Sequence, residues 1–341
     1  MVPKESRVTL TEVARAAGVS LATASKVMNG RDDVREQTRL EVTAVAQEMG
    51  YEPRRRAPAP RRRVCIVFNT LTSPYELQVL EGAEEAAHRA DIELLVMKAQ
   101  REERLAPLSR GWMADLAARG IDGVVAVTTP VGPEHVRWSR DLDLPLIVVD
   151  PVVHHEEVRG LVTISATNWE GGMAAVQRLV ELGHRRIGVL SGPADSIPAR
   201  QRVLGYRTVL EQAGLPFDEE LVVGANFDYA EGHRGAQRLL ALPDPPTAIF
   251  AVSDTLGVGV LRAARERGLE VPRDLSVISF DDSMIARWTF PQLTAVHQPL
   301  FSMGQVAVER LLALSADPGL FAHPFKLETH LVERESTAAP R

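Results

Sequence analysis

Helical periodicity marks the beginning of the chain. Apolar residues recur three and four positions apart: Leu10, Val13, Ala14 and Ala17. Thr9 and Glu12 have the spacing of a capping box, in which each side chain satisfies a free backbone N–H at a helix start. Gly18 follows, and glycine readily adopts the positive φ that ends a helix. The pattern predicts a helix that begins at Leu10 and ends before Gly18.

Two more helices are predicted in the same segment. Ser20 can cap a second helix that runs to about Met28, and Asp33 and Glu36 repeat the capping-box spacing ahead of a third. The third is expected to bury an apolar face and to stop at a glycine: Val42, Val45, Ala46, Met49 and then Gly50. The short turn at Gly18 fits a helix-turn-helix, whose second helix enters the major groove of DNA. Any three-helix bundle would show the same periodicity, so the pattern leaves both interpretations open.

A different pattern begins at Val64, where short apolar runs alternate with longer amphipathic stretches. Eight runs have the character of strands: Val64–Phe68, Ile92–Met97, Gly123–Val127, Pro145–Val149, Leu161–Ser165, Ile187–Leu190, Ala248–Ala251 and Leu275–Phe280. Strands that alternate with helices predict parallel sheets with helices on both faces. Ligands of such folds bind outside the carboxyl ends of the strands, so the residues after each strand are candidates for a site.

Polar residues occupy those positions. They are Asn69 to Tyr75, Thr128-Thr129, Asp150, Ser191-Gly192-Pro193, Ser253-Asp254 and Asp281-Asp282. Carboxylates and amides can bind several hydroxyl groups, and an aromatic ring can stack on a sugar, so the set suits a polyhydroxyl ligand. Asp150, Asp254 and Asp281 could instead cap helices or form turns. Phe227 and Trp288 could instead be packing residues, and Arg202 could be a surface arginine of a helix.

Charge separates the beginning of the chain from the rest. The 341 residues carry a formal net charge of −6. Residues 1–63 hold 13 Lys and Arg against 8 Asp and Glu, a net +5, which leaves −11 on the remainder. A basic segment on an acidic body indicates a polyanion-binding module joined to a domain that does not bind polyanions. A solvated basic tail would give the same charges.

The composition of the chain indicates the cellular compartment in which the protein is found. The 45% hydrophobic and 25% charged content is ordinary for a globular protein. No apolar run reaches the roughly 20 residues that span a bilayer. The single cysteine, Cys65, excludes an internal disulfide framework, and residues 1–9 lack the apolar centre of a secretion signal. We therefore expect a cytoplasmic protein.

The sequence lacks motifs that carry enzyme chemistry. It has no nucleophile elbow, Walker loop, dinucleotide fingerprint or zinc motif, so an α/β enzyme is disfavoured. No ligand cluster accompanies Asp281-Asp282, and we expect neither a metal nor a cofactor. A periplasmic ligand-binding protein would share the predicted α/β body, but the absent signal and the N-terminal helices argue against it.

The residues of the first segment are more specific than their periodicity. The runs VTLTEVARAAGVSLATASKVMNG and EVTAVAQEMGYEP closely resemble the DNA-binding headpiece of the lactose-repressor (LacI/GalR) family. By that resemblance, Leu21, Ala22 and Lys26 stand at base-reading positions. The phosphate-contacting positions are Ser20, Thr23, Ser25 and Asn29, and Thr9, Arg54, Arg55 and Arg56 complete the candidate DNA-binding set. Lys26 replaces the family's usual Arg, which keeps the charge but loses the bidentate fork to guanine.

The linker departs from the family pattern. Members usually continue with a short hinge helix whose leucine wedges into the minor groove of the operator. Residues 54–63 instead read RRRAPAPRRR, which is shorter and lacks leucine. Pro58 and Pro60 remove helix N–H donors, so we expect an extended linker in the free protein. Its six arginines would either neutralise DNA phosphates or serve as a charged tether.

The body resembles the effector-binding core of the same family, which is shared with periplasmic sugar-binding proteins. The resemblance is carried by ELGHRRIGVLSGP, ARQRVLGYRTVL, PTAIFAVSDTLGVGVLRAARERGLEVPRDLSVISFDD and PQLTAVHQPL. Arg202 matches the family's effector-binding arginine, Phe227 a stacking position, and Gln298 a strand that crosses between lobes. The implied effector-binding set is Asn69, Tyr75, Asp150, Arg202, Phe227, Ser253, Asp254, Asp281 and Gln298; Asn69 and Tyr75 are its weaker members, and Trp288 is a further weak candidate.

These observations predict an all-α helix-turn-helix headpiece joined to an α/β two-lobed core. We place the headpiece at 1–53, the linker at 54–63, the effector-binding and dimerisation domain at 64–335 and a tail at 336–341. The resemblance implies a homodimer that represses carbohydrate-utilisation genes from a palindromic operator and leaves it when a sugar or oligosaccharide binds.

The effector class is read from three further runs. VFNTLTSPYELQVLEG, ATNWEGG and QPLFSMG look most like actinobacterial members that respond to fragments of xylan or β-glucan. A nucleoside or an amino-acid-derived effector stays open. Co-repression in place of induction also stays open.

Overall fold

The structure is a computed structural model that describes residues 8–29, 31, 33–51, 62–99, 108–152, 160–317 and 323–341. The chain divides into two compact units, Met1–Pro60 and Arg61–Arg341, and each is described by itself. The predicted DNA-binding arginines Arg54, Arg55 and Arg56 lie outside the described residues, as does most of the linker. In the described part of the chain, no helix is long and apolar enough to cross a membrane.

The first unit, which we call the headpiece, is a three-helix bundle. Its helices are α1 (Leu10–Ala16), α2 (Leu21–Met28) and α3 (Glu36–Glu48). The predicted capping box is confirmed, because Glu12 N donates to Thr9 Oγ1 and Thr9 N donates to Glu12 Oε2. Gly18 has φ +63°, as expected of a helix stop. A small core holds the helices together: Val13, Ala14, Ala24, Val27, Val42 and Ala46.

The predicted capping box at the start of the third helix is wrong. The residue that caps α3 is Arg35, whose side chain makes no capping hydrogen bond. Asp33 lies two residues earlier and pairs with Lys26, whose Nζ is 2.6 Å from Asp33 Oδ2. The helix begins at Glu36, two residues later than the capping box requires, so Asp33 does not occupy the cap position and its carboxylate binds the Lys26 ammonium instead.

The second unit, which we call the core, contains two six-stranded sheets. The sheet of the N-lobe has the order β11-β5-β4-β3-β1-β2, from β1 (Arg63–Phe68), β2 (Glu93–Lys98), β3 (Gly123–Val127), β4 (Leu146–Val149), β5 (Val162–Ala166) and β11 (Phe325–Leu327). The sheet of the C-lobe has the order β12-β10-β9-β8-β6-β7, from β6 (Ile187–Leu190), β7 (Val222–Val223), β8 (Ala248–Ala251), β9 (Ser276–Asp281), β10 (Thr294–His297) and β12 (His330–Val332). All neighbouring strands are parallel except β12, which runs antiparallel to β10.

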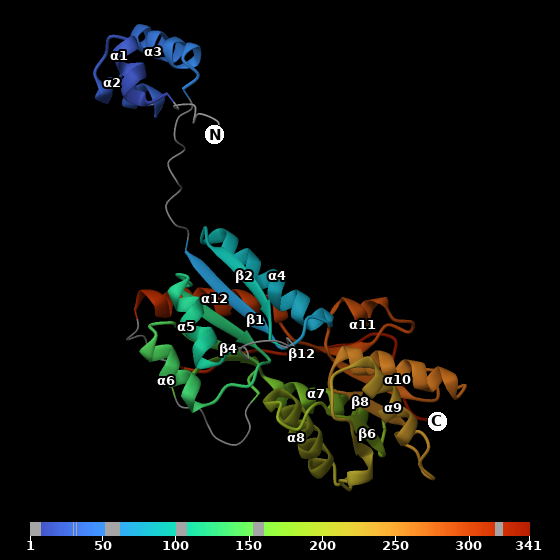
Figure 1. Ribbon diagram of the computed structural model, residues 1–341. Coiled ribbons are helices and arrows are strands. Elements are labelled where there is room, and N and C mark those ends of the chain that lie inside the picture. The colour runs from blue at the N-terminus through green and yellow to red at the C-terminus, as the bar shows by residue number, and fades with distance from the viewer. Residues whose placement is uncertain are drawn as a thin grey trace, which may run out of the picture. The chain divides into compact units, whose positions relative to one another are not determined.

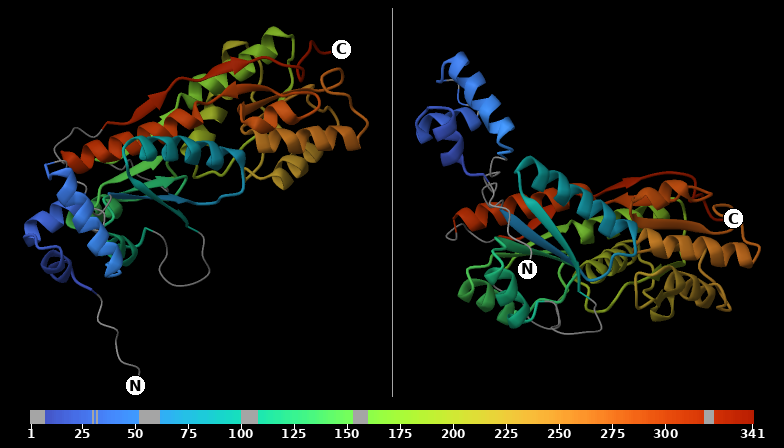
Figure 2. Two further views of the ribbon diagram at one scale, coloured as in Figure 1. Left: turned by 90° about the horizontal axis from the view of Figure 1, so that it is seen from above. Right: turned by 45° about the horizontal axis from the view of Figure 1, so that its top comes forward.

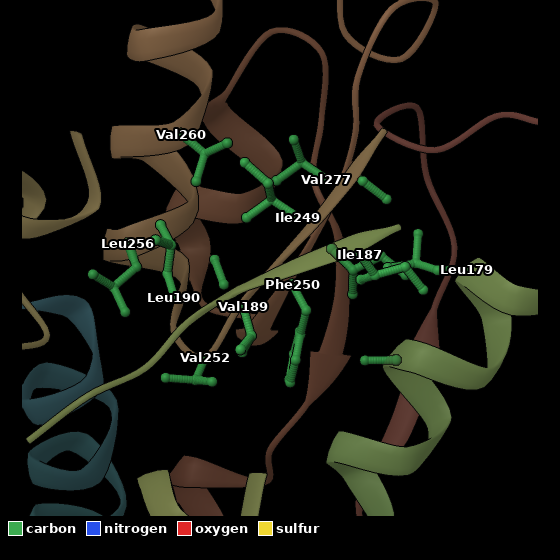
Figure 3. Close-up of a cluster of buried hydrophobic side chains, with 14 of the residues drawn as sticks. Leu179, Ile187, Val189, Leu190, Ile249, Phe250, Val252, Leu256, Val260 and Val277 are labelled. Carbon is green, nitrogen blue, oxygen red and sulfur yellow. The ribbon is translucent and has the colours of Figure 1, made fainter. Parts of the chain in front are cut away.

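Helices cover both sheets, as the alternating pattern predicts (Figure 1). The N-lobe carries α4 (Pro74–Arg89), α5 (Arg110–Ala118), α6 (Pro133–Asp141) and α12 (Leu300–Ala316). The C-lobe carries α7 (Asn168–Glu181), α8 (Ile197–Gln212), α9 (Tyr229–Leu239), α10 (Asp254–Glu266), α11 (Met284–Trp288) and the 3₁₀ turn Glu219–Leu221. Figure 3 shows the C-lobe core, where Phe250 and Val189 lie between Leu256 of α10 and Leu179 of α7. The strands β3, β4, β6 and β8 are buried on both faces, which explains why their predicted runs are continuously apolar.

Reciprocal glycines let three helix pairs approach closely. The pairs are α4 with α12 (Gly82 and Gly304), α7 with α8 (Gly172 and Gly205) and α9 with α10 (Gly232 and Gly259). A Cβ atom at Gly82 would collide with the carbonyl oxygen of Phe301 on α12. A Cβ atom at Gly172 would collide with the backbone of Arg202 on α8. These contacts fix Arg202 next to the start of α7.

The described chain passes between the lobes at three places (Figures 1 and 2). These crossings join β5 to α7, β10 to α12 and β11 to β12. The lobes also touch directly, because Val152 forms a bridge with Ser196 and Ile197 N donates to Pro151 O at 3.4 Å. The carboxyl ends of the strands in both sheets therefore meet the crossings at one junction.

Candidate functional site

Arg202 lies at the centre of the junction between the lobes and is 3% exposed. Its Nε donates to Asn168 Oδ1 at 2.8 Å, and its Nη1 donates to Val252 O at 2.7 Å. Nη1 also faces Asp281 Oδ1 at 3.4 Å, and the guanidinium lies 3.7 Å above the ring of Phe280. Burial of a charged group costs free energy unless the group has such partners, and these contacts therefore stabilise the buried Arg202 guanidinium.

Gln298 connects that arginine to the N-lobe. Its Oε1 accepts from Arg202 Nη2 at 2.5 Å, and its Nε2 donates to Asp150 Oδ2 at 3.1 Å. Asp150, at the end of β4, also accepts from Tyr75 Oη at 2.7 Å and from Ser165 Oγ at 2.5 Å. Five of the nine predicted effector-binding residues thus form one hydrogen-bonded network, which we call the junction network: Tyr75, Asp150, Arg202, Asp281 and Gln298.

Two further members of the junction network were not among the predicted residues. Asn168 is fully buried and donates to Ser165 Oγ at 3.0 Å while it accepts from Arg202. The second member, Ser165, lies inside β5, where the rule that selects residues after each strand does not apply, whereas Asn168 lies two residues beyond β5 and fits that rule. The predicted strand ended at Ser165, and its following residues were left out of the candidate set.

The backbone is strained where the strands of the junction end. In the described part of the chain, seven non-glycine residues have positive φ, and four of them end strands here: Thr128, Asp150, Asp281 and Asp282. Such conformations cost free energy and persist where the surroundings enforce them, and they cluster at functional sites. The strain gives a second reason to place a site at this junction.

Burial also shifts the acid–base properties of the junction. Burial and the nearby Asp150 carboxylate raise the pKa of Tyr75 well above its usual range, so its hydroxyl stays a donor. Burial raises the pKa of Asp281 well above its ordinary value, although Arg202 opposes this change. A low-dielectric site that offers both acceptors and donors is suited to bind a neutral polar ligand with several hydroxyl groups.

Two predicted residues make their hydrogen bonds inside the C-lobe. Ser253 caps α10 and accepts from Leu256 N at 3.3 Å. Asp254 accepts from Ser279 Oγ and from Ser283 N, both at 2.6 Å. Burial raises the pKa of Asp254 to about 6 against these hydrogen bonds. Ser253 and Asp254 lie next to the junction network, because they directly follow Val252, whose carbonyl accepts from Arg202 Nη1.

The remaining predicted residues lie around the junction network without a hydrogen bond to it. Asn69 follows β1 and is partly buried, with its backbone N–H bound to Val127 O at 3.2 Å. Phe227 packs its ring against Gly192, which follows β6. The ring of Phe227 therefore lies near the end of β6. Trp288 is 76% exposed, so it is no packing residue.

Two hollows in the N-lobe lie away from the junction network. One, of about 270 Å³, is lined by residues of α6, β4 and the end of α12, among them Arg140 and Ser315. The other, of about 420 Å³, lies between α12 and β11. No residue of the junction network lines either hollow.

The headpiece presents its candidate residues on one face of α2. Ala24 and Val27 face the core of the bundle, whereas Leu21, Ala22 and Lys26 are exposed. Several predicted phosphate-contacting residues serve the helix ends: Ser20 accepts from Thr23 N at 3.1 Å, and Asn29 Nδ2 donates to Ser25 O at 2.8 Å. Thr9 caps α1. α2 thus exposes Leu21, Ala22 and Lys26, the three residues that the family resemblance assigns to base reading.

Comparison with known proteins matches both units. Residues 9–54 match the model of bacterial regulatory proteins of the lacI family, and residues 176–337 match that of a periplasmic binding protein-like domain. The HTH-type transcriptional repressor PurR of Pectobacterium carotovorum is 30% identical over 335 residues, which cover 97% of each chain. The chain belongs to the LacI family of bacterial regulators.

Solved structures of the family have the same architecture. A complex of the transcriptional regulator CelR with cellobiose has a TM-score of 0.72 and 30% identity, and covers 97% of this chain and 100% of its own. The lac repressor dimer bound to operator and the anti-inducer ONPF has a TM-score of 0.77 and 26% identity, with coverage of 98% and 100%. The predicted fold of this LacI-family protein is confirmed, and so is its role as a DNA-binding regulator instead of an enzyme.

Proposed function

We propose that this LacI-family protein is a cytoplasmic repressor of carbohydrate-utilisation genes, and that a sugar or oligosaccharide bound at the junction network releases it from a palindromic operator. One observation carries the proposal. Residues that the family resemblance assigns to effector binding come from both lobes and share one buried network. A ligand that binds there contacts both lobes at once, so it can change their relative position.

The chemistry of the junction network supports a polyhydroxyl ligand. Asp150, Gln298 and Arg202 offer acceptors and donors that are now bound to one another, and hydroxyl groups can replace each of these partners. Phe227 offers a ring for the apolar face of a sugar. The related regulator CelR is known as a cellobiose complex, which supports fragments of plant polysaccharides as the first candidates.

A structural route leads from the junction network to the start of the core. Gln298 precedes α12 by two residues, and its Nε2 also contacts Met303 Sδ on that helix at 3.4 Å. At the other end of α12, Ser315 accepts from Arg62, a residue that directly follows the undescribed part of the linker. The glycine contacts hold α4 and α12 backbone to backbone, so we expect the two helices to move together. A displacement of Gln298 would thus move the anchor of the linker.

Reading a palindromic operator requires a two-fold dimer. Exposed apolar side chains on the core support a homodimer: Leu77, Trp288, Phe290 and Phe301. Trp288 and Phe290 are 76% and 97% exposed, which is unusual for residues of this size. The elements α4 and α11 lie along the same side of the core in Figure 1. We assign this surface to the dimer interface.

The effector is tested first by thermal shift. The full chain is screened against a panel of mono- and oligosaccharides that includes cellobiose and xylobiose, with nucleosides and amino acids as separate arms. We expect a saccharide to raise the melting temperature. Tyr75→Phe removes one hydroxyl from the junction network and should weaken binding of the hit about tenfold. Tyr229→Phe, at an exposed tyrosine of α9, is the matched control.

Release from DNA is tested with the same hit. Operator duplexes are first selected from a randomised palindromic pool, and their affinity is measured by gel shift with and without the saccharide. Linkage requires that a ligand which weakens DNA binding also binds the DNA complex more weakly, by the same factor. Equal saccharide affinity for free and DNA-bound protein would refute the allosteric scheme, and tighter binding to the complex would make the saccharide a co-repressor.

A further inference from the structure

Lys26 lies on α2 at a position that the family resemblance assigns to base reading, where the family usually has an arginine. An arginine there would present two parallel N–H donors to O6 and N7 of a guanine. Lys26 is a point charge on a flexible stem and has no fixed fork. Alone, it would bind any acceptor within reach, DNA phosphates included, and would discriminate poorly between bases.

The structure pairs this lysine with an acid. Lys26 Nζ lies 2.6 Å from Asp33 Oδ2, and the two side chains are 50% and 58% exposed. The hydrogen bond from Lys26 lowers the pKa of Asp33, which keeps this carboxyl ionised at neutral pH. Arg31 is the other cation whose charge acts on Asp33. The pair is therefore charged and accessible in the free headpiece.

The backbone around Asp33 is anchored on both sides. Arg31 N donates to Lys26 O at 3.0 Å, which ties the segment to the end of α2. Arg39 of α3 donates from Nη2 to Arg31 O at 2.7 Å. On the other side, Val34 packs against the core of the headpiece. Asp33 thus approaches Lys26 from a fixed position.

We propose that Asp33 is a positioning residue for base recognition: it holds one of the three N–H groups of Lys26 and aims the other two at O6 and N7 of one guanine in each half-site. The pair then supplies the orientation that an arginine has by itself. The Asp33 carboxylate also repels nearby phosphates, so the acid disfavours contacts of Lys26 to the DNA backbone. This inference rests on the proposed function, because it needs α2 in the major groove.

The test compares base preferences of the full chain. The wild type, Asp33→Ala, Lys26→Arg and the double variant Lys26→Arg/Asp33→Ala each select from a randomised palindromic duplex pool. We expect Asp33→Ala to lower the preference for guanine at one position per half-site about tenfold. Total affinity for the pool should not fall, since a negative charge near DNA is lost. The double variant should keep the guanine preference, because a guanidinium needs no partner to form its fork.

Two controls separate orientation from charge and from folding. Glu36→Ala removes an exposed acid from the first turn of α3 and should leave the guanine preference unchanged. Exposed ion pairs contribute little to stability, so Asp33→Ala should melt like the wild type.

Three results would overturn the inference. They are an unchanged preference in Asp33→Ala, an equal loss in Glu36→Ala, or an equal loss in the double variant. A wild type that selects no sequence at all would instead refute the proposed function.

Discussion

The headpiece and the core arrange their candidate functional residues in opposite ways. In the headpiece the base-reading candidates Leu21, Ala22 and Lys26 are exposed on one helix, and the partner of Lys26, Asp33, is only seven residues away in sequence. In the core the candidate residues are buried, and Gln298 and Asp150 meet across 148 residues. A buried donor that loses its partner costs stability, whereas an exposed one turns to water. Function and stability should therefore be separable in the headpiece and coupled in the core.

The largest expected effect is on the close helix contacts of the core. Gly82→Ala places a Cβ against the carbonyl of Phe301, so α4 and α12 must separate. We expect a loss of about 3 kcal/mol in the free energy of unfolding, measured by calorimetry. Gly268→Asn is the control, because Gly268 has φ +72° with nothing within 4 Å and asparagine tolerates this conformation. A melting temperature that Gly82→Ala leaves unchanged would show that the helix pair is not rigid.

The next effect tests the coupling of function and stability at the junction network. Arg202→Met leaves Asn168, Gln298 and the carbonyl of Val252 without their donor. We expect a loss of about 3 kcal/mol in the free energy of unfolding together with loss of the saccharide response. Arg207→Met, an exposed arginine on the same helix that lies over Phe217, should cost only about 0.5 kcal/mol. If Arg202→Met lost the response at full stability, function and stability would be separable here too.

A third substitution tests the opposite expectation for the headpiece. Lys26→Ala should lower affinity for the selected operator about tenfold. Its melting temperature should stay that of the wild type, because Lys26 is exposed and pairs only near the surface. Arg262→Ala removes an exposed cation from α10 of the core and should leave operator affinity unchanged. A clear drop in stability with Lys26→Ala would contradict the contrast between the two units.

The smallest expected effect is a pH dependence of core stability. His184 binds Thr247 Oγ1 and Ala338 O, and burial lowers the pKa of His184 below its ordinary 6.5. Below pH 6.5 the unfolded chain takes up a proton that the folded chain resists, so stability falls as pH falls. His184→Gln removes this contribution. The advantage of the wild type over the variant should therefore shrink by about 2 °C between pH 7.5 and 5.5. An advantage that grew on acidification would contradict this assignment.

Local patterns predicted much of this molecule. The start of α1, the extent of α2 and the eight apolar runs of β1, β2, β3, β4, β5, β6, β8 and β9 agree with the structure within a residue or so at their ends. No local pattern predicted β7, β10, β11 and β12, which are short or lie at edges and crossings, although the family resemblance implied a crossing strand at Gln298. Such strands carry little periodicity of their own, and their neighbours induce their conformation.

For the candidate sites too, some features follow from the local sequence and others only from the fold. The sequence by itself determined the helix-turn-helix, the alternation of strands and helices, and the polar residues that end the strands, because each of these depends on neighbours within a few positions. Only the tertiary structure decided that Asp150, Gln298 and Arg202 share one network, that Asn168 joins it, and that Asp33 turns from α3 to Lys26. A hydrogen-bond partner is chosen by distance in space, and folding brings together groups that no local pattern relates.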